Sequence, residues 1–129
     1  MPGEHADPFQ YAVLRVVPDI ARGECLNAGV VLWCRTRGFL AARVQLDRAR
    51  LRAMARDLDP LPVERHLEGL VRIAAGAAGA GPVARLEPSE RFGWLAAPSS
   101  TVVQPSPVHT GLSADPARTL ERLFAKLVQ

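Results

Sequence analysis

Two segments of the sequence carry polar residues that can do chemistry, each set between apolar stretches. They are Arg22, Glu24 and Asn27 in the first segment and Gln104, Ser106 and His109 in the second. A carboxylate can serve as a general acid, a general base or a metal ligand, and arginine with histidine can stabilise negative charge. Because such groups are costly when buried alone, we expect the two segments to meet in one polar pocket at a sheet edge.

A structural interpretation of the first segment is also open, and it is the more common outcome. Asn27 would then bond to the backbone of a neighbouring loop, and Arg22 would pair with Glu24. Gly29 would let Trp33 or a helix approach the strand closely. Convergence of the two segments in space distinguishes the two interpretations.

No complete catalytic constellation is visible in the sequence. Ser106 and His109 have the residue types of a nucleophile and its base, but the Gly-x-Ser-x-Gly motif is absent and geometry defines a triad. Cys25 and Cys34 fall in an apolar predicted strand, where buried thiols are usually inert. The sequence therefore leaves open whether the protein is an enzyme.

Metal or cofactor binding is not predicted. His5, His66 and His109 are widely separated, and no Cys-x-x-Cys pair is present. The glycines of residues 76–81 follow a predicted helix, whereas a phosphate-binding loop precedes one. We expect His66 to pack at the edge of the core.

A row of arginines forms a third candidate site. Arg48, Arg52 and Arg56 recur at every fourth position, so their side chains share one side of a helix. The row could contact phosphates or an acidic partner, and its alternative is a solvated surface partly neutralised by nearby aspartates. No aromatic residues are interleaved for base stacking, which weakens a nucleic-acid interface.

The elements that must position these residues follow from the hydrophobic pattern. Alternation in the last predicted strand, with Arg43 and Gln45 opposite its apolar residues, indicates that one sheet face is wet. The strands are expected at 11–17, 25–34 and 39–45, and the helices begin near Asp47, Pro62 and Asp115. This order predicts an α+β fold with a three-stranded antiparallel meander packed against three helices, and a short run at 101–104 could add a fourth strand.

Length and composition bound the remaining possibilities. The 129 residues fit a single domain at 10–129 after a disordered lead-in at 1–9. The formal charge is +3, and no apolar run approaches the roughly 20 residues that span a bilayer. Two cysteines roughly 30 Å apart on one strand cannot form a disulfide, which favours a cytoplasmic location.

Several blocks of the sequence resemble a known bacterial family. The segments Tyr11–Asp19, Arg22–Leu32 and Ser99–Ser106, with His109 and Asp115-Pro116, are similar to domain-of-unknown-function family 3037 from about Phe9 to Leu127. The family brings no established activity. Its members often occur beside genes for HipA-like kinases, so the resemblance implies a partner or regulator of such a kinase. A helix-turn-helix for DNA binding is not apparent.

Two functional classes remain open from the sequence. The first is a non-catalytic interaction module that works with a partner protein. The alternative is a small enzyme acting on a nucleic acid or a phosphorylated substrate, with Glu24 as acid/base or metal ligand and Arg22 with His109 stabilising charge. Nucleic-acid binding through the arginine row is a weaker third possibility, with salt-dependent affinity as its signature.

Overall fold

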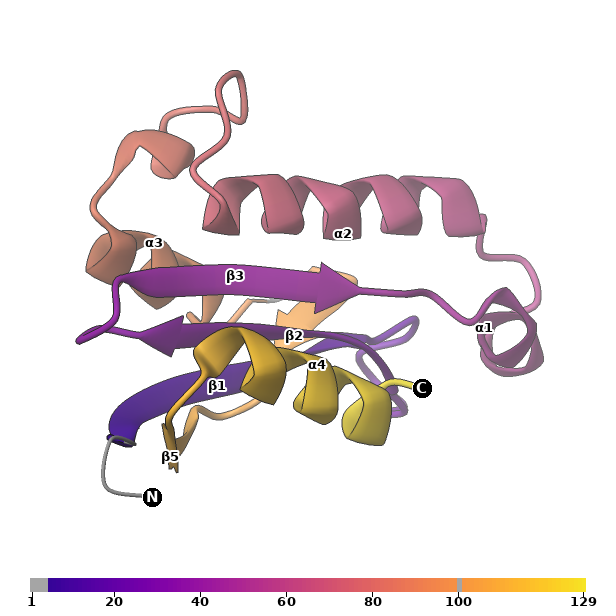
Figure 1. Cartoon of the computed structure of the whole chain (residues 1–129). Helices are drawn as coiled ribbons and strands as arrows, with labels where there is room; N and C mark the ends of the chain where they lie inside the picture. Colours follow the sequence, from indigo (N-terminus) through magenta and orange to yellow (C-terminus); the bar gives the residue numbers. More distant parts are fainter. Residues whose placement is uncertain (1–4, 100) are drawn as a thin grey trace.

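The computed structural model describes residues 5–99 and 101–129 as an antiparallel sheet with helices on both faces (Figure 1). The strands are β1 (Asp7–Val16), β2 (Leu26–Cys34), β3 (Phe39–Val44), β4 (Val103–Pro105) and β5 (His109–Ser113). The helices are α1 (Arg48–Met54), α2 (Pro60–Ala74), α3 (Pro88–Leu95) and α4 (Pro116–Leu127), with a short 3₁₀ turn at Val83–Arg85. The predicted α+β class and antiparallel sheet are confirmed, but the described residues form five strands and four helices instead of three of each.

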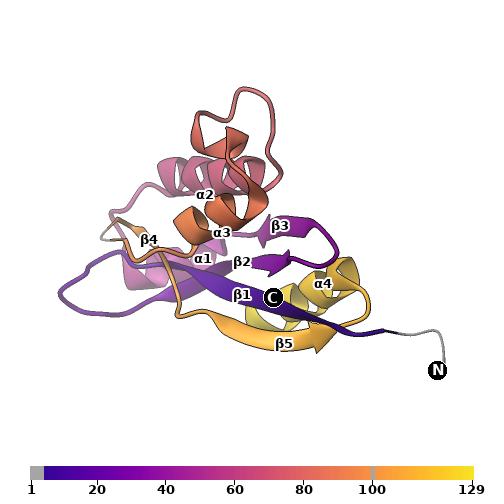
Figure 2. The same cartoon turned by 90° about the vertical axis from the view of Figure 1, so that its left-hand side faces the viewer.

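The first strand in the sequence lies in the middle of the sheet. The strand order is β3-β2-β1-β4, and β5 also pairs with β1. The edge of β1 that faces away from β2 is therefore covered by two short consecutive strands, β4 and β5 (Figure 2). Gln104 in β4 lies opposite Arg15, and His109 in β5 lies opposite Tyr11. Between the two strands, the backbone N–H of Ser106 donates to the carbonyl of Val13 at 2.8 Å.

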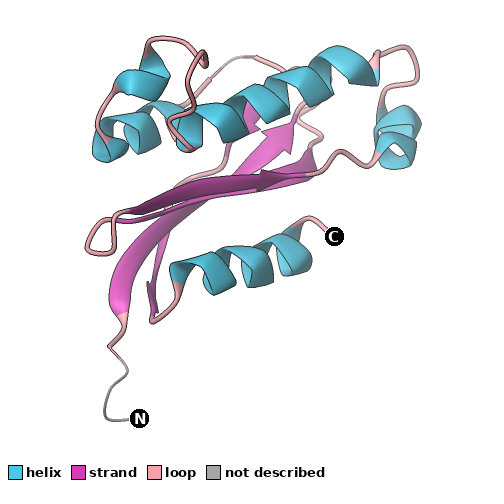
Figure 3. Cartoon of the chain, turned by 45° about the horizontal axis from the view of Figure 1, so that its top comes forward, coloured by secondary structure: helices cyan, strands magenta, loops and turns pink. Residues whose placement is uncertain are grey.

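Alternating side chains of the central strands build two apolar layers, one on each face of the sheet. The face under α2 and α3 contributes Leu14, Val16, Leu26 and Val31, which pack with Leu67 and Phe92. The opposite face contributes Phe9, Val30, Leu32 and Cys34, which pack with Leu120 of α4. Figure 3 shows the sheet between these two layers of helices.

The expectation that one face of β3 is wet holds only in part, because α4 packs on that face while Arg43 and Gln45 stay exposed. The guanidinium carbon of Arg43 is 4.7 Å from the centre of the Phe124 ring. The same guanidinium donates to the carboxylate of Glu121 at 2.9 Å. An arginine can cover apolar surface with its stem and stack on an aromatic ring, so Arg43 contacts α4 although its side chain stays about half exposed.

Aspartates begin three of the helices, as N-capping chemistry requires. Asp47 and Asp115 accept hydrogen bonds from backbone N–H groups of α1 and α4, which confirms the prediction that helices begin at these two residues. Asp59 caps α2, so this helix begins two residues earlier than the predicted Pro62. The alanine–glycine run then ends α2, where Gly76 adopts a φ of +66°.

The N-terminal boundary differs from the prediction of a disordered lead-in. Residues 1–4 lie outside the described residues, but Asp7–Phe9 already belong to β1. The buried carboxylate of Asp7 accepts a hydrogen bond from Arg37 at 2.7 Å and lies 3.1 Å from the His5 ring nitrogen. A single aspartate in a polar leader gives no sequence signal for such pairing, so the strand was predicted too short.

The two cysteines are both free, and their surroundings differ. Cys34 is buried within β2, whereas Cys25 is exposed and precedes that strand. The prediction that they would be unpaired is confirmed, but placing Cys25 inside the strand was wrong.

Candidate functional site

The loop between β1 and β2 is organised by its own aspartate. The side chain of Asp19 accepts a hydrogen bond from the N–H of Ala21 at 3.0 Å. Its carbonyl accepts from the N–H of Gly23 at 3.2 Å, and Gly23 has a φ of +73°, which a glycine adopts without strain. This turn places Arg22 and Glu24 side by side at the surface.

Arg22 and Glu24 form an ion pair with each other. The Nε of Arg22 lies 2.6 Å from Oε1 of Glu24, and both side chains are largely exposed. The hydrogen bond and the charge of Glu24 raise the pKa of Arg22 above its usual value. This pairing is the structural interpretation considered for the segment, and it leaves each group compensated by the other.

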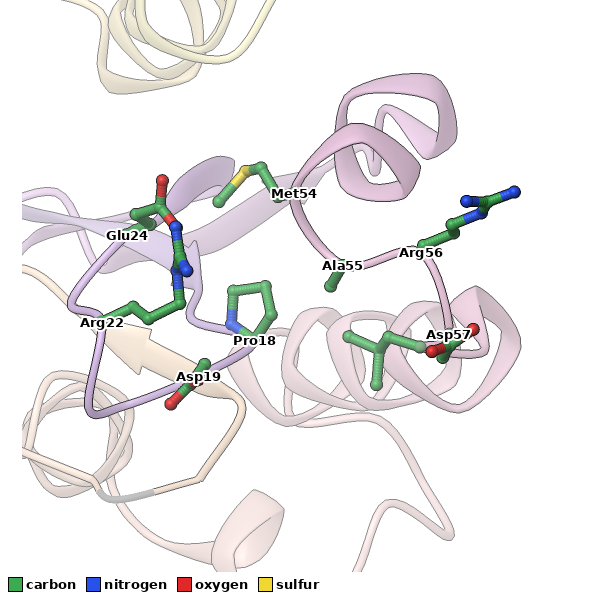
Figure 4. Close-up of a pocket in the computed structure, with 9 residues that line it drawn as sticks. Pro18, Asp19, Arg22, Glu24, Met54, Ala55, Arg56 and Asp57 are labelled. Carbon is green, nitrogen blue, oxygen red and sulfur yellow. The ribbon is translucent and has the colours of Figure 1, made fainter.

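A cavity of about 370 Å³, here called the loop pocket, lies between this loop and the end of α1 (Figure 4). The pair of Arg22 and Glu24 forms one side, and Met54 with Ala55 forms the facing side. Arg56 borders the cavity, but its side chain points away from the pair. The loop pocket therefore combines a neutralised charged rim with apolar walls.

Asn27 and Gln104 lie on either side of Arg15 in the sheet. Both residues pair with Arg15, Asn27 from β2 and Gln104 from β4. The amide of Asn27 donates to the carbonyl of Leu127 at the end of α4, at 3.0 Å. The amide of Gln104 donates to the carbonyl of Thr101 at 3.0 Å. Backbone carbonyls thus satisfy both amides, and the Asn27 bond also fastens α4 to the sheet.

Ser106 has a structural role in the strand pairing. Its Oγ accepts from the N–H of Val13 at 2.8 Å and donates to the carbonyl of Pro107 at 2.9 Å. The side chain of His109 stacks on Tyr11 with ring centroids 5.2 Å apart. With its proton held by a carbonyl and its residue buried, Ser106 is not arranged as a nucleophile for His109.

The expected single pocket does not form among these described residues. Asn27 and Gln104 share a row of the sheet, but Arg22 and Glu24 face α1 in the loop pocket. His109 lies opposite Tyr11, five positions along β1 from the Val16–Leu26 pair, or roughly 17 Å at about 3.3 Å per residue. Pairing Glu24 with His109 in one site was therefore wrong.

The predicted row of three arginines on one helix is only partly confirmed. Arg48 and Arg52 lie on α1, but the helix ends at Met54, so Arg56 belongs to the turn that follows it. Arg48 forms two hydrogen bonds with the carboxylate of Glu64 on α2, one of them at 2.9 Å. The hydrogen bond from Arg48 lowers the pKa of Glu64. Arg52 and Arg56 line a small cavity together with Arg48.

A groove that the sequence did not indicate runs between α2, α3 and the segment that joins α3 to β4. Two neighbouring cavities of about 330 Å³ and 250 Å³ share His66, Thr101 and Val103. We call them together the helix groove. Its apolar lining residues include Val63, Leu70, Trp94, Leu95 and Pro98.

Trp94 is the most unusual residue of the helix groove. It stays 48% exposed, although its neighbours Phe92 and Leu95 on α3 are buried. His66 is an exposed residue of α2 at the groove wall, not a packed core-edge histidine as expected. The sequence shows a tryptophan at this position, but sequence alone does not show that its side chain stays exposed beside a groove.

The described residues contain no group of three histidine, cysteine, aspartate or glutamate side chains placed to hold a metal ion. Within the same part of the chain, no helix is long and apolar enough to cross a membrane.

The fold and surface features define a class of protein, an antiparallel α+β sheet between helix layers with an apolar groove and a separate charged loop pocket. The chain belongs to the family described as protein of unknown function (DUF3037), whose model matches residues 11–128. No curated protein and no solved structure matches the chain.

Proposed function

We propose that this protein is a non-catalytic interaction module that binds an apolar segment of a partner protein in the helix groove. The observation that carries the proposal is Trp94, a half-exposed tryptophan at the wall of a groove with apolar lining. Tryptophan is enriched among the residues that dominate binding energy at protein interfaces. Its exposure here costs hydration free energy that a partner would recover on binding.

The shape of the groove supports an elongated occupant. Its two cavities are joined through His66, Thr101 and Val103, so the lining continues along α2. The exposed side chain of Leu61 lies near the start of the same helix. An apolar segment anchored beside Trp94 would also pass the polar side chains of His66 and Thr101, which lie where the two cavities meet.

For the partner we propose a HipA-like kinase. This step rests on the resemblance to the family, whose members often occur beside genes for such kinases. The cytoplasm is the proposed location, in keeping with two free cysteines. Retention on the kinase would make the protein its regulator or its structural subunit.

The alternative of a small enzyme draws its support from the loop pocket, whose volume of about 370 Å³ suits a small ligand. Glu24 and Arg22 would be its working residues. They already compensate each other at 2.6 Å, and His109 lies elsewhere in the sheet. The interaction module therefore requires fewer rearrangements and is the function that we propose.

Co-expression with a HipA-like kinase from the same organism, followed by size-exclusion chromatography, tests the proposal. We expect one shared peak at micromolar concentrations, and we expect Trp94→Ala to weaken the complex by at least about tenfold, a typical loss at an interface hot spot. Leu112→Ala is the matched control, because Leu112 is exposed on β5, outside the residues that line the groove.

Two separate peaks for the wild-type protein would remove the kinase as partner. A complex that Trp94→Ala leaves intact would remove the groove as its binding surface. If Glu24→Gln abolished a measurable activity on a phosphorylated substrate while the melting temperature stayed unchanged, the enzyme alternative would replace the proposal.

A further inference from the structure

Three arginine side chains surround one small cavity at the junction of α1 and α2. The cavity has a volume of about 140 Å³, and its lining consists of Arg48, Arg52 and Arg56 with Leu51, Leu58 and Pro60. Arg48 and Arg52 are one helical turn apart on α1, so they share a side of that helix. Arg56 follows the helix end, and Figure 4 shows its side chain directed away from Arg22 and Glu24.

The charges around the cavity are not balanced. Arg48 is held by the carboxylate of Glu64. No carboxylate of a described residue forms an ion pair with Arg52 or Arg56. The guanidinium groups of Arg52 and Arg56 therefore remain available to bind an anion beside the cavity.

Within the described part of the chain, the nearby aspartates, Asp57 and Asp59, form no ion pair with Arg52 or Arg56. The carboxylate of Asp59 accepts the N–H of Leu61 and so caps α2. The first turn of α2 also contains Pro60 and Pro62, which carry no backbone N–H. The arginines, and not the start of α2, are the groups that can hold an anion here.

We propose that this cavity, the arginine pocket, binds a phosphomonoester, either on a small molecule or on a phosphorylated side chain. A phosphomonoester carries a charge of about −1.5 to −2 at pH 7, which matches two uncompensated guanidinium groups. Guanidinium groups bind phosphate oxygens through two parallel hydrogen bonds. The volume of about 140 Å³ suits a single terminal group better than a run of backbone phosphates.

The pocket also contains apolar residues. Leu51 is fully buried beneath it, and Leu58 and Pro60 form its remaining lining. The three arginines are exposed around this apolar lining, so salt screens their attraction for phosphate and the attraction is largest at low ionic strength. The arginine pocket shares Arg56 and Leu58 with the loop pocket, but neither the ion pair of Arg22 and Glu24 nor Trp94 lines it.

Titration of the full chain with inorganic phosphate at low ionic strength, followed by two-dimensional NMR, tests the proposal. We expect saturable shifts confined to α1 and the start of α2. The double variant R52Q/R56Q should bind about tenfold or more weakly, because it removes two charge-assisted contacts. The control is R50Q/R65Q, which removes the same charge from two exposed arginines that do not line the cavity.

A second ligand distinguishes between a phosphorylated protein and a phosphorylated small molecule. A short phosphoserine peptide that binds more tightly than inorganic phosphate would support a phosphorylated protein as the ligand. Equal affinity would show that the pocket recognises the phosphate group alone, as it would on a small molecule. Equal weakening by the control variant would overturn the proposal, since it would indicate general charge attraction. So would an oligonucleotide without terminal phosphates that binds as tightly as inorganic phosphate, because the surface would then recognise a polyanion.

Discussion

The side-chain oxygen of Ser106 accepts a hydrogen bond from the backbone N–H of Val13 at 2.8 Å, across 93 residues of sequence. Both residues are buried, and the contact lies where the edge segment of the sheet passes from β4 to β5. Ser106 has the residue type of a nucleophile, but its side-chain oxygen instead accepts the N–H of Val13 in the place of a backbone carbonyl from a neighbouring strand.

Replacing Ser106 by alanine should therefore destabilise the fold. The substitution leaves the N–H of Val13 without its acceptor, which costs about 1–3 kcal/mol when the group is buried. Urea unfolding followed by circular dichroism measures the change. Ser89→Ala serves as control, because Ser89 is exposed on α3 and should change stability little. Equal midpoints for the two variants would contradict the structural role of Ser106.

Two glycines should respond to alanine with opposite signs. A Cβ at Gly29 would lie 2.8 Å from the carbonyl oxygen of Arg43 and 2.8 Å from a methyl carbon of Val44, so the neighbouring strand would have to move. We expect Gly29→Ala to cost about 1–3 kcal/mol, the usual range for overpacking.

Gly69→Ala is the matched substitution. A Cβ at Gly69 meets nothing within 4 Å, and the residue lies inside α2. Alanine in a helix interior is favoured over glycine by about 0.8–1.0 kcal/mol, so this variant should unfold at higher temperature. Thermal unfolding of both variants checks the pair, and a stabilised Gly29→Ala would show that β2 and β3 are spaced differently.

The contact between Glu64 and Arg48 should make stability depend on pH. The hydrogen bond from Arg48 holds the pKa of Glu64 below its ordinary value of 4.5 in the folded state. The folded protein then binds fewer protons than the unfolded chain near that pH. The stabilisation is complete above pH 4.5 and disappears as the pH falls through the folded pKa.

Comparison with Glu64→Gln isolates this contribution. The urea midpoint of the wild type should exceed that of the variant near pH 6, and the difference should shrink below pH 4.5. Because Arg48 is largely exposed, added salt should also reduce the difference. A difference that stays constant between these pH values would show that the two side chains do not interact in solution.

Local chemistry predicted much of the fold. Asp47 and Asp115 begin helices because each offers a carboxylate to free backbone N–H groups, which is a property of a few adjacent residues. The antiparallel strands followed from the alternation of apolar and polar residues in the last predicted strand. Strand β5 was missed, since His109–Ser113 lacks an apolar pattern and becomes a strand by pairing with β1.

The site was less predictable, because its geometry depends on contacts between distant segments. Asn27 and Gln104 share a row through Arg15, as pairing across β1 allows. His109 is carried further along β1 by the residues that follow Ser106. The helix groove needs α2, α3 and the chain before β4 together, and no periodicity in one element reveals the cavity that they enclose.

Because β1 is central, its two edges can be paired only at different times during synthesis of the chain. Translation produces β1 first, but the segment that covers its second edge starts only at Val103. Until then a nascent chain can pair β1 with β2 alone, and its open edge is a template for other strands. The hydrogen bonds of Ser106 with Val13 and of Asn27 with Leu127 span 93 and 100 residues, so they also form only after the last part of the chain has been made. A protein shortened before β4 would therefore leave its middle strand half paired, and we expect such a fragment to aggregate.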